Sequence, residues 1–161
     1  MRGQVYNDLE VGASAEEVWA VYSSPELPRL IVELQPGVFE KIDIVQGNGR
    51  VDTVLHVVLA QGLPEPREWK EKFMKIDHKE RTKVVRQIEG GYLGLGFRFY
   101  EIIFKIIAKD EHSCIIRSTT AFDIEESFEA NASLINASSM WGMAKAISNY
   151  VMQKKESGSN K

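Results

Sequence analysis

The sequence predicts an α+β domain in which a curved antiparallel sheet wraps a long C-terminal helix. Three observations indicate this class. A strand and two short helices open the chain, segments that alternate apolar with polar residues fill positions 38–122, and apolar residues recur at helical spacing after Glu125. Short links between the alternating segments make consecutive strands antiparallel neighbours. A sheet that wraps one helix, with no second sheet to close it, leaves a cavity that a ligand can occupy.

The N-terminal elements follow from alternation and from helix start signals. Apolar residues alternate up to Val11, which predicts an opening strand. Ser14 with Glu17 three residues later forms a capping box and predicts a short helix. Ser24 as N-cap and Pro25 as first helical residue predict a second helix, which the next Pro-Gly pair ends.

The remaining elements are six strands and one helix. The expected strands cover 38–45, 52–59, 67–76, 82–89, 97–109 and 113–122. After Glu125, the helical period continues for about 28 residues and predicts one long amphipathic helix.

Composition limits the number of domains and the class of partner. The chain has 161 residues, of which 43% are hydrophobic, and this predicts a single domain over 1–155 with a polar, disordered tail over 156–161. The net charge is -3 without a long basic block, so a nucleic-acid partner is not expected. No apolar stretch is long enough to span a bilayer and no secretory leader is visible, so we expect a cytoplasmic protein that binds no membrane.

Metal and cofactor sites are not expected. The three histidines, His56, His78 and His112, are scattered over a strand and two turns at spacings that bring no two of them to one metal ion. Cys114 is the only cysteine and begins a strand, where a small buried apolar side chain is the usual interpretation. A Cys-His catalytic pair remains open but has no supporting pattern.

Large, adaptable apolar side chains are candidates for lining the predicted cavity. They are Phe73, Phe104, Leu134, Met140, Trp141 and Met143. On composition alone, the same residues could equally form a packed core without a cavity.

An acid and a base lie on two adjoining predicted strands. Trp69, Glu71, Phe73 and Lys75 share one face of the strand 67–76, and the two aromatic residues indicate that this face points inward. Glu71 among apolar groups would have a raised pKa, which suits a carboxylate to proton transfer. Lys83 on the next strand could complement it, although the pattern leaves the direction of its side chain open. The alternative is that Glu71 and Lys83 are surface partners in a charged ladder.

The chain resembles the norcoclaurine synthase-like branch of the pathogenesis-related class 10 (Bet v 1-like) family, a branch close to norbelladine synthase. The resemblance runs from about residue 8 to residue 154. The stretches that carry it are LEVGASAEEVWAVYSSPEL, LQPGVFEKIDI, WKEKFMKID, IEGGYLGLGF and MAKAISNYV. It implies a helix-grip fold in which a seven-stranded curved antiparallel sheet, two short helices and a long C-terminal helix surround a hydrophobic cavity.

The resemblance also implies a chemistry. The branch performs cofactor-free Pictet-Spengler condensation of an arylethylamine such as dopamine with an aryl aldehyde, and its norbelladine-forming relative forms the imine. Glu71 and Lys83 fall on the catalytic glutamate and lysine of the branch. Lys83 would shuttle the proton that lets water leave the carbinolamine, and Glu71 would accept a phenol or ring proton.

Several positions depart from the family pattern. Trp69 replaces an entrance tyrosine, Ile102 replaces a pocket aspartate, and Arg50 and Asp52 replace two loop glycines. Glu101 is next to the lost aspartate, but alternation points it outward. The expected substrate-binding residues are Trp69, Phe73, Tyr100, Ile102, Phe104, Met140 and Met143.

The primary hypothesis is therefore a Pictet-Spenglerase-type lyase of plant alkaloid biosynthesis that acts as a monomer or weak dimer on small aromatic amines and aldehydes. The departures predict altered substrates, weaker catalysis or catalysis that stops at the imine. Two alternatives stay open: a non-catalytic carrier of a hydrophobic metabolite or hormone, and an isomerase or cyclase that acts on an alkaloid precursor.

Overall fold

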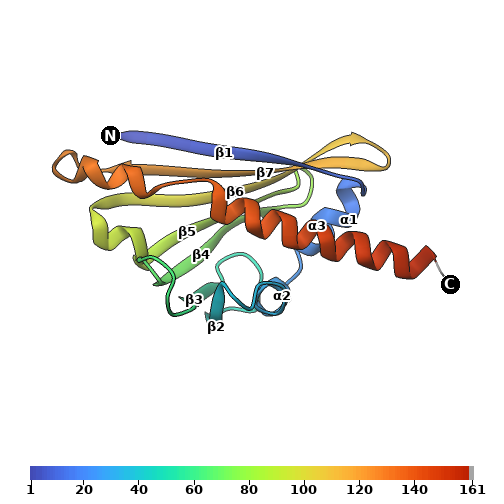
Figure 1. Ribbon diagram of the computed structural model, residues 1–161, viewed down its shortest axis with the longest axis horizontal. Coiled ribbons are helices and arrows are strands. Elements are labelled where there is room, and N and C mark those ends of the chain that lie inside the picture. The colour runs from blue at the N-terminus through green and yellow to red at the C-terminus, as the bar shows by residue number, and fades with distance from the viewer. Residues whose placement is uncertain (160–161) are drawn as a thin grey trace.

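A seven-stranded antiparallel sheet curves around the long helix α3 (Figure 1). The computed structural model describes residues 1–159. The strands are β1 Arg2–Val11, β2 Phe39–Gln46, β3 Val54–Leu59, β4 Glu68–Asp77, β5 Thr82–Gly90, β6 Phe97–Asp110 and β7 Ser113–Ile124. The helices are α1 Ala15–Tyr22, α2 Leu27–Leu34 and α3 Ser138–Ser159, with 3-10 segments η1 Gly91–Leu95 and η2 Glu126–Leu134. The predicted class is confirmed, and each of the six expected strands lies within two residues of its predicted bounds.

The sheet order is β1-β7-β6-β5-β4-β3-β2, so β1 and β2 are its two edges. The short links do make β2 to β7 consecutive antiparallel neighbours, as the sequence predicts. The first strand instead pairs with the last, from Arg2 opposite Asp123 to Val11 opposite Cys114. Both strands are long and run side by side, and α3 contacts them on the inner face of the sheet (Figure 1).

The capping box at α1 is confirmed, but the predicted start of α2 is wrong. Ser14 Oγ accepts a hydrogen bond from the Glu17 backbone N–H at 3.1 Å, and the Glu17 carboxylate accepts one from the Ser14 N–H. Ser24 and Pro25 form a turn before α2, in which Ser24 Oγ accepts from the Glu26 N–H. Ser24 and Pro25, which were predicted to start α2, therefore belong to the turn before it. Pro28 occupies the early helical position that was predicted for Pro25.

The C-terminal region is two elements, although one long helix was predicted. The 3-10 segment η2 is followed by a break, and α3 begins only at Ser138. Asn7 on β1 holds the break by donating from Nδ2 to the carbonyl of Ala137 at 2.6 Å. This contact is long-range, so the local period could not reveal it. The tail predicted to be disordered is helical as far as Ser159, and residues 160–161 lie outside the described part of the chain.

The core lies between α3, the two short helices and the concave face of the sheet. Met143, Ala144, Ile147 and Val151 of α3 are buried at helical spacing, and Trp19 and Tyr22 of α1 pack with them. The sheet contributes inward residues of every strand except β2, among them Phe73, Phe104 and Ile116. Packing is continuous around α1 and the C-terminal half of α3 and opens into a cavity near the start of α3.

Candidate active site

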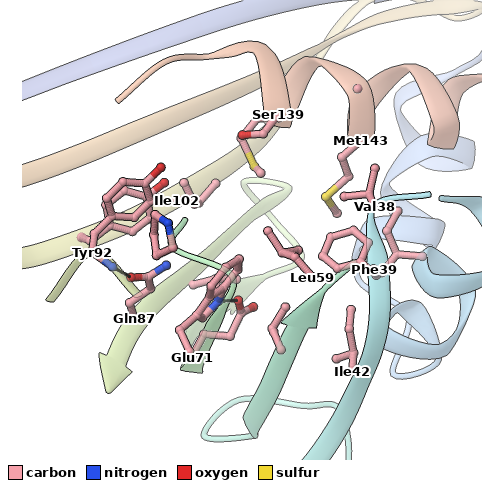
Figure 2. A pocket seen from close by; sticks show the side chains of 18 of the residues that line it. Val38, Phe39, Ile42, Leu59, Glu71, Gln87, Tyr92, Ile102, Ser139 and Met143 are labelled. Carbon is pink, nitrogen blue, oxygen red and sulfur yellow. Dashed lines mark hydrogen bonds between the residues drawn. The ribbon is translucent and has the colours of Figure 1, made fainter. Parts of the chain in front are cut away.

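A cavity of about 690 Å³ lies between the concave face of the sheet, α2 and the first turns of α3 (Figure 2). Strands β3 to β6 form its floor, and the loop 63–66 and the segment 133–136 contribute to its rim. The volume is within the range for sites that bury a drug-sized ligand. The alternative of a packed core without a cavity is therefore wrong.

Five of the six predicted cavity liners do line it, namely Phe73, Phe104, Leu134, Met140 and Met143. Trp141 is the exception, because its side chain is 39% exposed on the outer side of α3. Trp141 lies two residues before Met143, about 200° around α3, so it cannot share the buried face of Met143, Ile147 and Val151. All seven residues expected to bind substrate also line the cavity: Trp69, Phe73, Tyr100, Ile102, Phe104, Met140 and Met143.

Strand β4 presents only part of its predicted inward face to the cavity. Trp69, Glu71 and Phe73 line the cavity, but Lys75 is exposed and lies 3.9 Å from Asp77 in an ion pair. A register irregularity between Phe73 and Lys75 shifts the alternation by one, so that Ile76 packs against the core. The prediction for Lys75 was wrong because a β-bulge leaves little trace in the hydrophobic pattern.

Glu71 on β4 lines the wall of the cavity. Figure 2 shows its side chain near that of Gln87, which comes from the adjoining strand β5. Burial raises the pKa of its carboxyl. A hydrogen bond that the Trp69 indole donates to Glu71 Oε1 at 2.8 Å opposes this effect, as does the charge of Lys83. The net upward shift brings the carboxyl toward the range in which it can accept and release a proton near neutral pH.

Lys83 points inward at the floor of the cavity and is only 1% exposed. Its Nζ donates to the backbone carbonyl of Tyr22 at 3.0 Å and lies 4.0 Å from the centre of the Phe73 ring. Burial lowers its pKa to about 8, and the charge of Glu71 acts in the opposite direction. The ammonium is therefore a much stronger acid than a lysine in water.

The interpretation of Glu71 and Lys83 as surface partners in a charged ladder is wrong. In the β4–β5 register, Glu71 lies opposite Gln87, and Lys83 lies opposite Ile76. Alternation on β5 sends Lys83, Val85 and Gln87 to the cavity. The outer face carries Arg86, which makes an ion pair with Glu101 at 2.8 Å.

The two departures from the family pattern inside the cavity are where the sequence analysis expected them. Trp69 and Ile102 both line it, and Ile102 is 9% exposed. Glu101 lies on the opposite face of β6, where its carboxylate binds Arg86, so it cannot replace a carboxylate at position 102.

The altered loop between β2 and β3 keeps a glycine-like backbone. Asp52 has φ of 73°, in the left-handed region, and Gly49 has φ of 92°. A Cβ at Gly49 would lie 2.5 Å from the carbonyl oxygen of Pro25. The backbone N–H of Gly49 donates to Thr53 Oγ1 at 2.8 Å. The loop therefore retains its tight path although Asp52 replaces a family glycine.

Sequence reasoning missed two polar residues of the cavity, Gln87 and Tyr92, which lie beside the predicted Tyr100. The rings of Tyr92 and Tyr100 stack with centroids 4.4 Å apart and planes 13° from parallel. Gln87 lies four residues after Lys83 on β5, so alternation places both side chains on one face of the strand. The pattern left the direction of Lys83 open, and the direction of Gln87 stayed open with it. The inward position of Tyr92 depends on η1, which the pattern did not predict.

The histidines and the cysteine lie in structural settings. His78 Nδ1 accepts a hydrogen bond from Trp19 Nε1 at 3.1 Å, and His56 Nε2 lies 2.7 Å from Glu68 Oε1. Cys114 is fully buried, which raises the pKa of its thiol to about 11. Within residues 1–159, no cluster of three or more His, Cys, Asp and Glu could hold a metal ion. Over the same residues, no helix is long and apolar enough to cross a membrane.

The pathogenesis-related protein Bet v 1 family profile matches residues 1–154, and the chain belongs to this family. It is 43% identical over 157 residues to S-norcoclaurine synthase 2 of Papaver somniferum, covering 96% of this chain and 68% of that protein. It is 39% identical over 155 residues to norbelladine synthase of Narcissus pseudonarcissus, covering 96% and 95%.

A solved relative supports the assignment in three dimensions. A structure of norcoclaurine synthase from Thalictrum flavum in complex with dopamine and hydroxybenzaldehyde superposes with a TM-score of 0.89. The two chains are 38% identical, and the match covers 95% of this chain and 88% of the other. The resemblance stated from the sequence is confirmed, and so is the helix-grip fold that it implied.

Proposed function

We propose that this protein is a norcoclaurine synthase-like lyase that condenses an arylethylamine with an aryl aldehyde in its cavity. The observation that carries the proposal is the pairing, in one apolar chamber, of a carboxylate with a raised pKa and an ammonium with a lowered pKa, Glu71 and Lys83. Environments that push an acid and a base toward neutral pH are typical of acid–base catalysis. The relatives named synthases support the same assignment.

Two proton transfers divide the reaction between these residues. The amine adds to the aldehyde to give a carbinolamine, and Lys83 gives a proton to its hydroxyl, which leaves as water. The resulting iminium carbon is attacked by the aromatic ring, and Glu71 accepts a phenol or ring proton as the carbon–carbon bond forms. The overall balance is one amine and one aldehyde in, one tetrahydroisoquinoline and one water out.

The cavity would contribute by holding the two reactants together. Its walls are mostly apolar, with Phe39, Ile42 and Leu59 facing the space beside Met143 (Figure 2). Confinement in reacting geometry replaces a bimolecular encounter and supplies a large part of the rate. Ile102 offers the iminium cation no carboxylate, so we expect slower cyclisation and a larger fraction of product released as the imine.

The test is condensation of dopamine with a panel of aryl aldehydes in a buffer without phosphate, followed by chiral chromatography. Borohydride added to parallel samples traps any imine as the secondary amine. Enantiomerically enriched tetrahydroisoquinoline would support the full reaction, and trapped amine above the level of a heat-denatured control would support a reaction that stops at the imine.

Racemic product at the rate of the denatured control, with no excess of trapped amine, would count against the synthase for these substrates. Tight binding of flat apolar ligands in that case would favour the carrier. Ligand turnover without the aldehyde would favour the isomerase or cyclase.

A further inference from the structure

Gln87 is a buried polar side chain of the cavity whose orientation is fixed. It is 7% exposed, and its Oε1 accepts a hydrogen bond from the Tyr92 backbone N–H at 2.9 Å. This bond assigns the amide, because only the oxygen can accept from an N–H. The bond also ties β5 to η1, the segment that follows the paired glycines Gly90 and Gly91.

The glycine pair makes room for this amide. A Cβ on Gly91 would lie 2.4 Å from Gln87 Oε1 and 2.9 Å from Trp69 Cβ. Gly90 and Gly91 have φ of 70° and 55°, a left-handed conformation that favours glycine. The IEGGYL stretch therefore has a physical task, which is to fold the backbone closely over the side chain of Gln87.

The nitrogen of the amide is available to a ligand. With its oxygen engaged by Tyr92, the Gln87 Nε2 has no hydrogen-bond partner among the described residues. Nε2 is not sealed off from solvent, because the unpartnered side-chain atoms that are sealed off belong to other residues. Since Gln87 lines the cavity, its two N–H donors face space that a bound molecule can reach.

Gln87 lies directly opposite Glu71 in the β4–β5 register, and the two side chains are drawn near each other at one end of the cavity (Figure 2). Side chains of directly opposed residues have Cβ atoms about 5 Å apart. A donor and an acceptor at this spacing can hold one hydroxyl between them: the carboxylate accepts the O–H proton, and the amide donates to a lone pair of the same oxygen.

We propose that Gln87 is a catalytic residue whose amide donates to the phenol oxygen of the amine substrate while Glu71 accepts the phenol proton. This inference depends on the proposed function. The O–H bond breaks, its proton goes to Glu71, and the electron pair stays on the oxygen as a phenolate, which Gln87 stabilises. Donors already in place where charge develops are an effective means of lowering a barrier.

The other groups near this end leave the task to Gln87. Lys83 lies four residues away on the same strand, about 13 Å along β5, and its ammonium is bonded to Tyr22. On β6 and η1, the Tyr100 and Tyr92 hydroxyls are neutral at this end and interact with each other, and that of Tyr100 also with Thr120. Trp69 donates to Glu71 itself. Glu71 is thus the charged neighbour of the bound hydroxyl, and Gln87 is the uncommitted donor.

The first test measures the pKa of 4-nitrophenol bound in the cavity, by absorbance of its phenolate, in the wild type and in two variants. Gln87→Met removes both hydrogen bonds, whereas Gln87→Glu keeps an acceptor for the Tyr92 N–H but replaces the donor by a carboxylate, whose charge also opposes the phenolate. Both variants should raise the pKa of bound nitrophenol by about one, a tenfold smaller phenolate fraction at a given pH. Gln46→Leu, which removes an exposed amide on the edge strand β2, is the matched control and should leave it unchanged.

The second test compares dopamine with its 3-methoxy analogue, in which the 3-hydroxyl, para to the ring carbon that attacks the iminium, has no proton for Glu71 to accept. The preference of the wild type for dopamine in kcat should shrink about tenfold in Gln87→Met, with a smaller change in KM. The nitrophenol test needs no synthase activity, so it decides the role of Gln87 even if the protein forms no tetrahydroisoquinoline. The same bound pKa in the wild type and both Gln87 variants, or an unchanged preference for dopamine in an active enzyme, would overturn the proposal.

Discussion

The two ends of the cavity differ in chemistry and in construction. One end carries Glu71, Gln87, Tyr92 and Tyr100, which come from β4, β5, η1 and β6. The other end carries apolar side chains on β2, β3 and α3 and on the short link before β2: Val38, Phe39, Ile42, Leu59 and Met143. Figure 2 shows the two groups on opposite sides of the same space. We call them the polar end and the apolar end.

The difference indicates a division of labour. The polar end is built on adjoining strands whose register fixes the positions of the functional groups, with Glu71 opposite Gln87. Such rigid support is what acid–base chemistry requires. The apolar end is formed by an edge strand, a short link and a methionine, which adapt more easily to the shape of a ligand. We therefore expect changes at the polar end to alter the chemical step and changes at the apolar end to alter substrate choice.

The largest expected effect is the pH dependence of the two proton-transfer groups, Lys83 and Glu71. Lys83 must be protonated to act as an acid, and its pKa is lowered to about 8. The rate of enantiomerically enriched product formation should fall about tenfold per pH unit above pH 8, or about a hundredfold by pH 10. On the acid side, the raised pKa of Glu71 should move the loss of activity toward neutral pH. A rate that stays level from pH 8 to pH 10 would exclude Lys83 as the acid.

The next effect concerns stability and the cost of burying that ammonium. The folded pKa of about 8 is below the ordinary value of 10.5, so the buried charge destabilises the fold below pH 8. The difference corresponds to about 3 kcal/mol, and the lost bond to Tyr22 offsets about 1 kcal/mol of it. Lys83→Met should therefore raise the free energy of unfolding in urea by about 2 kcal/mol at pH 7.

The size of this effect falls with pH in a defined way. Between pH 8 and pH 10.5, the unfolded chain binds more protons at Lys83 than the folded chain does, so the wild type gains stability as the pH rises. The advantage of Lys83→Met should vanish across this interval. A Lys83→Met protein less stable than the wild type at pH 7 would contradict the account of Lys83 as a costly functional group.

A smaller effect is expected at the glycine that supports the polar end. Gly91→Ala places a Cβ against Gln87 Oε1 and Trp69 at a φ of 55°. It should lower the free energy of unfolding by about 1–2 kcal/mol and reduce activity, because Gln87 has to move. Gly94→Ala in η1 is the matched control, since a Cβ there meets nothing within 4 Å. Equal stability of the two variants in thermal melting would refute the close-packing argument.

The smallest effect is expected at the apolar end. Leu59→Ala removes side-chain volume from the cavity wall on β3, four residues from Leu55, which pairs with Glu71. KM for bulky aryl aldehydes should change about threefold to tenfold, while kcat stays within about twofold and the pH profile is unchanged. A change in the pH profile of this variant would show that the two ends are coupled.

The sequence predicted the regular elements well because their signals are local. The capping box at Ser14 and the alternation along β2 to β7 depend on near neighbours, and both are confirmed. The predicted start of α2 and the single C-terminal helix were wrong because a turn at Ser24 and the contact of Asn7 with Ala137 decide them. The prediction for Trp141 was wrong for a different reason, since it lies about 200° around α3 from Met143 and so faces away from the buried side.

The candidate site was predictable only in part, for a related reason. Trp69, Glu71 and Phe73 face the cavity because alternation holds up to the bulge, and the bulge then turns Lys75 outward. Lys83 was a candidate from its place on the strand next to Glu71, but two adjacent valines hid its direction, and only the family resemblance assigned it a role. Gln87 is a polar residue with no motif of its own, and only the packing of Gly91 against its amide reveals its fixed position.

The central claim is that Glu71 and Lys83 carry the chemistry in this cavity. Its most direct test is enantiomeric excess and rate for dopamine with the best aryl aldehyde in Glu71→Gln, Lys83→Met and the apolar-end control Leu59→Ala. The account predicts that Glu71→Gln and Lys83→Met each lose about a hundredfold or more in rate and give racemic product, while Leu59→Ala keeps the enantiomeric excess. Enriched product at the wild-type rate from Glu71→Gln or Lys83→Met would contradict it.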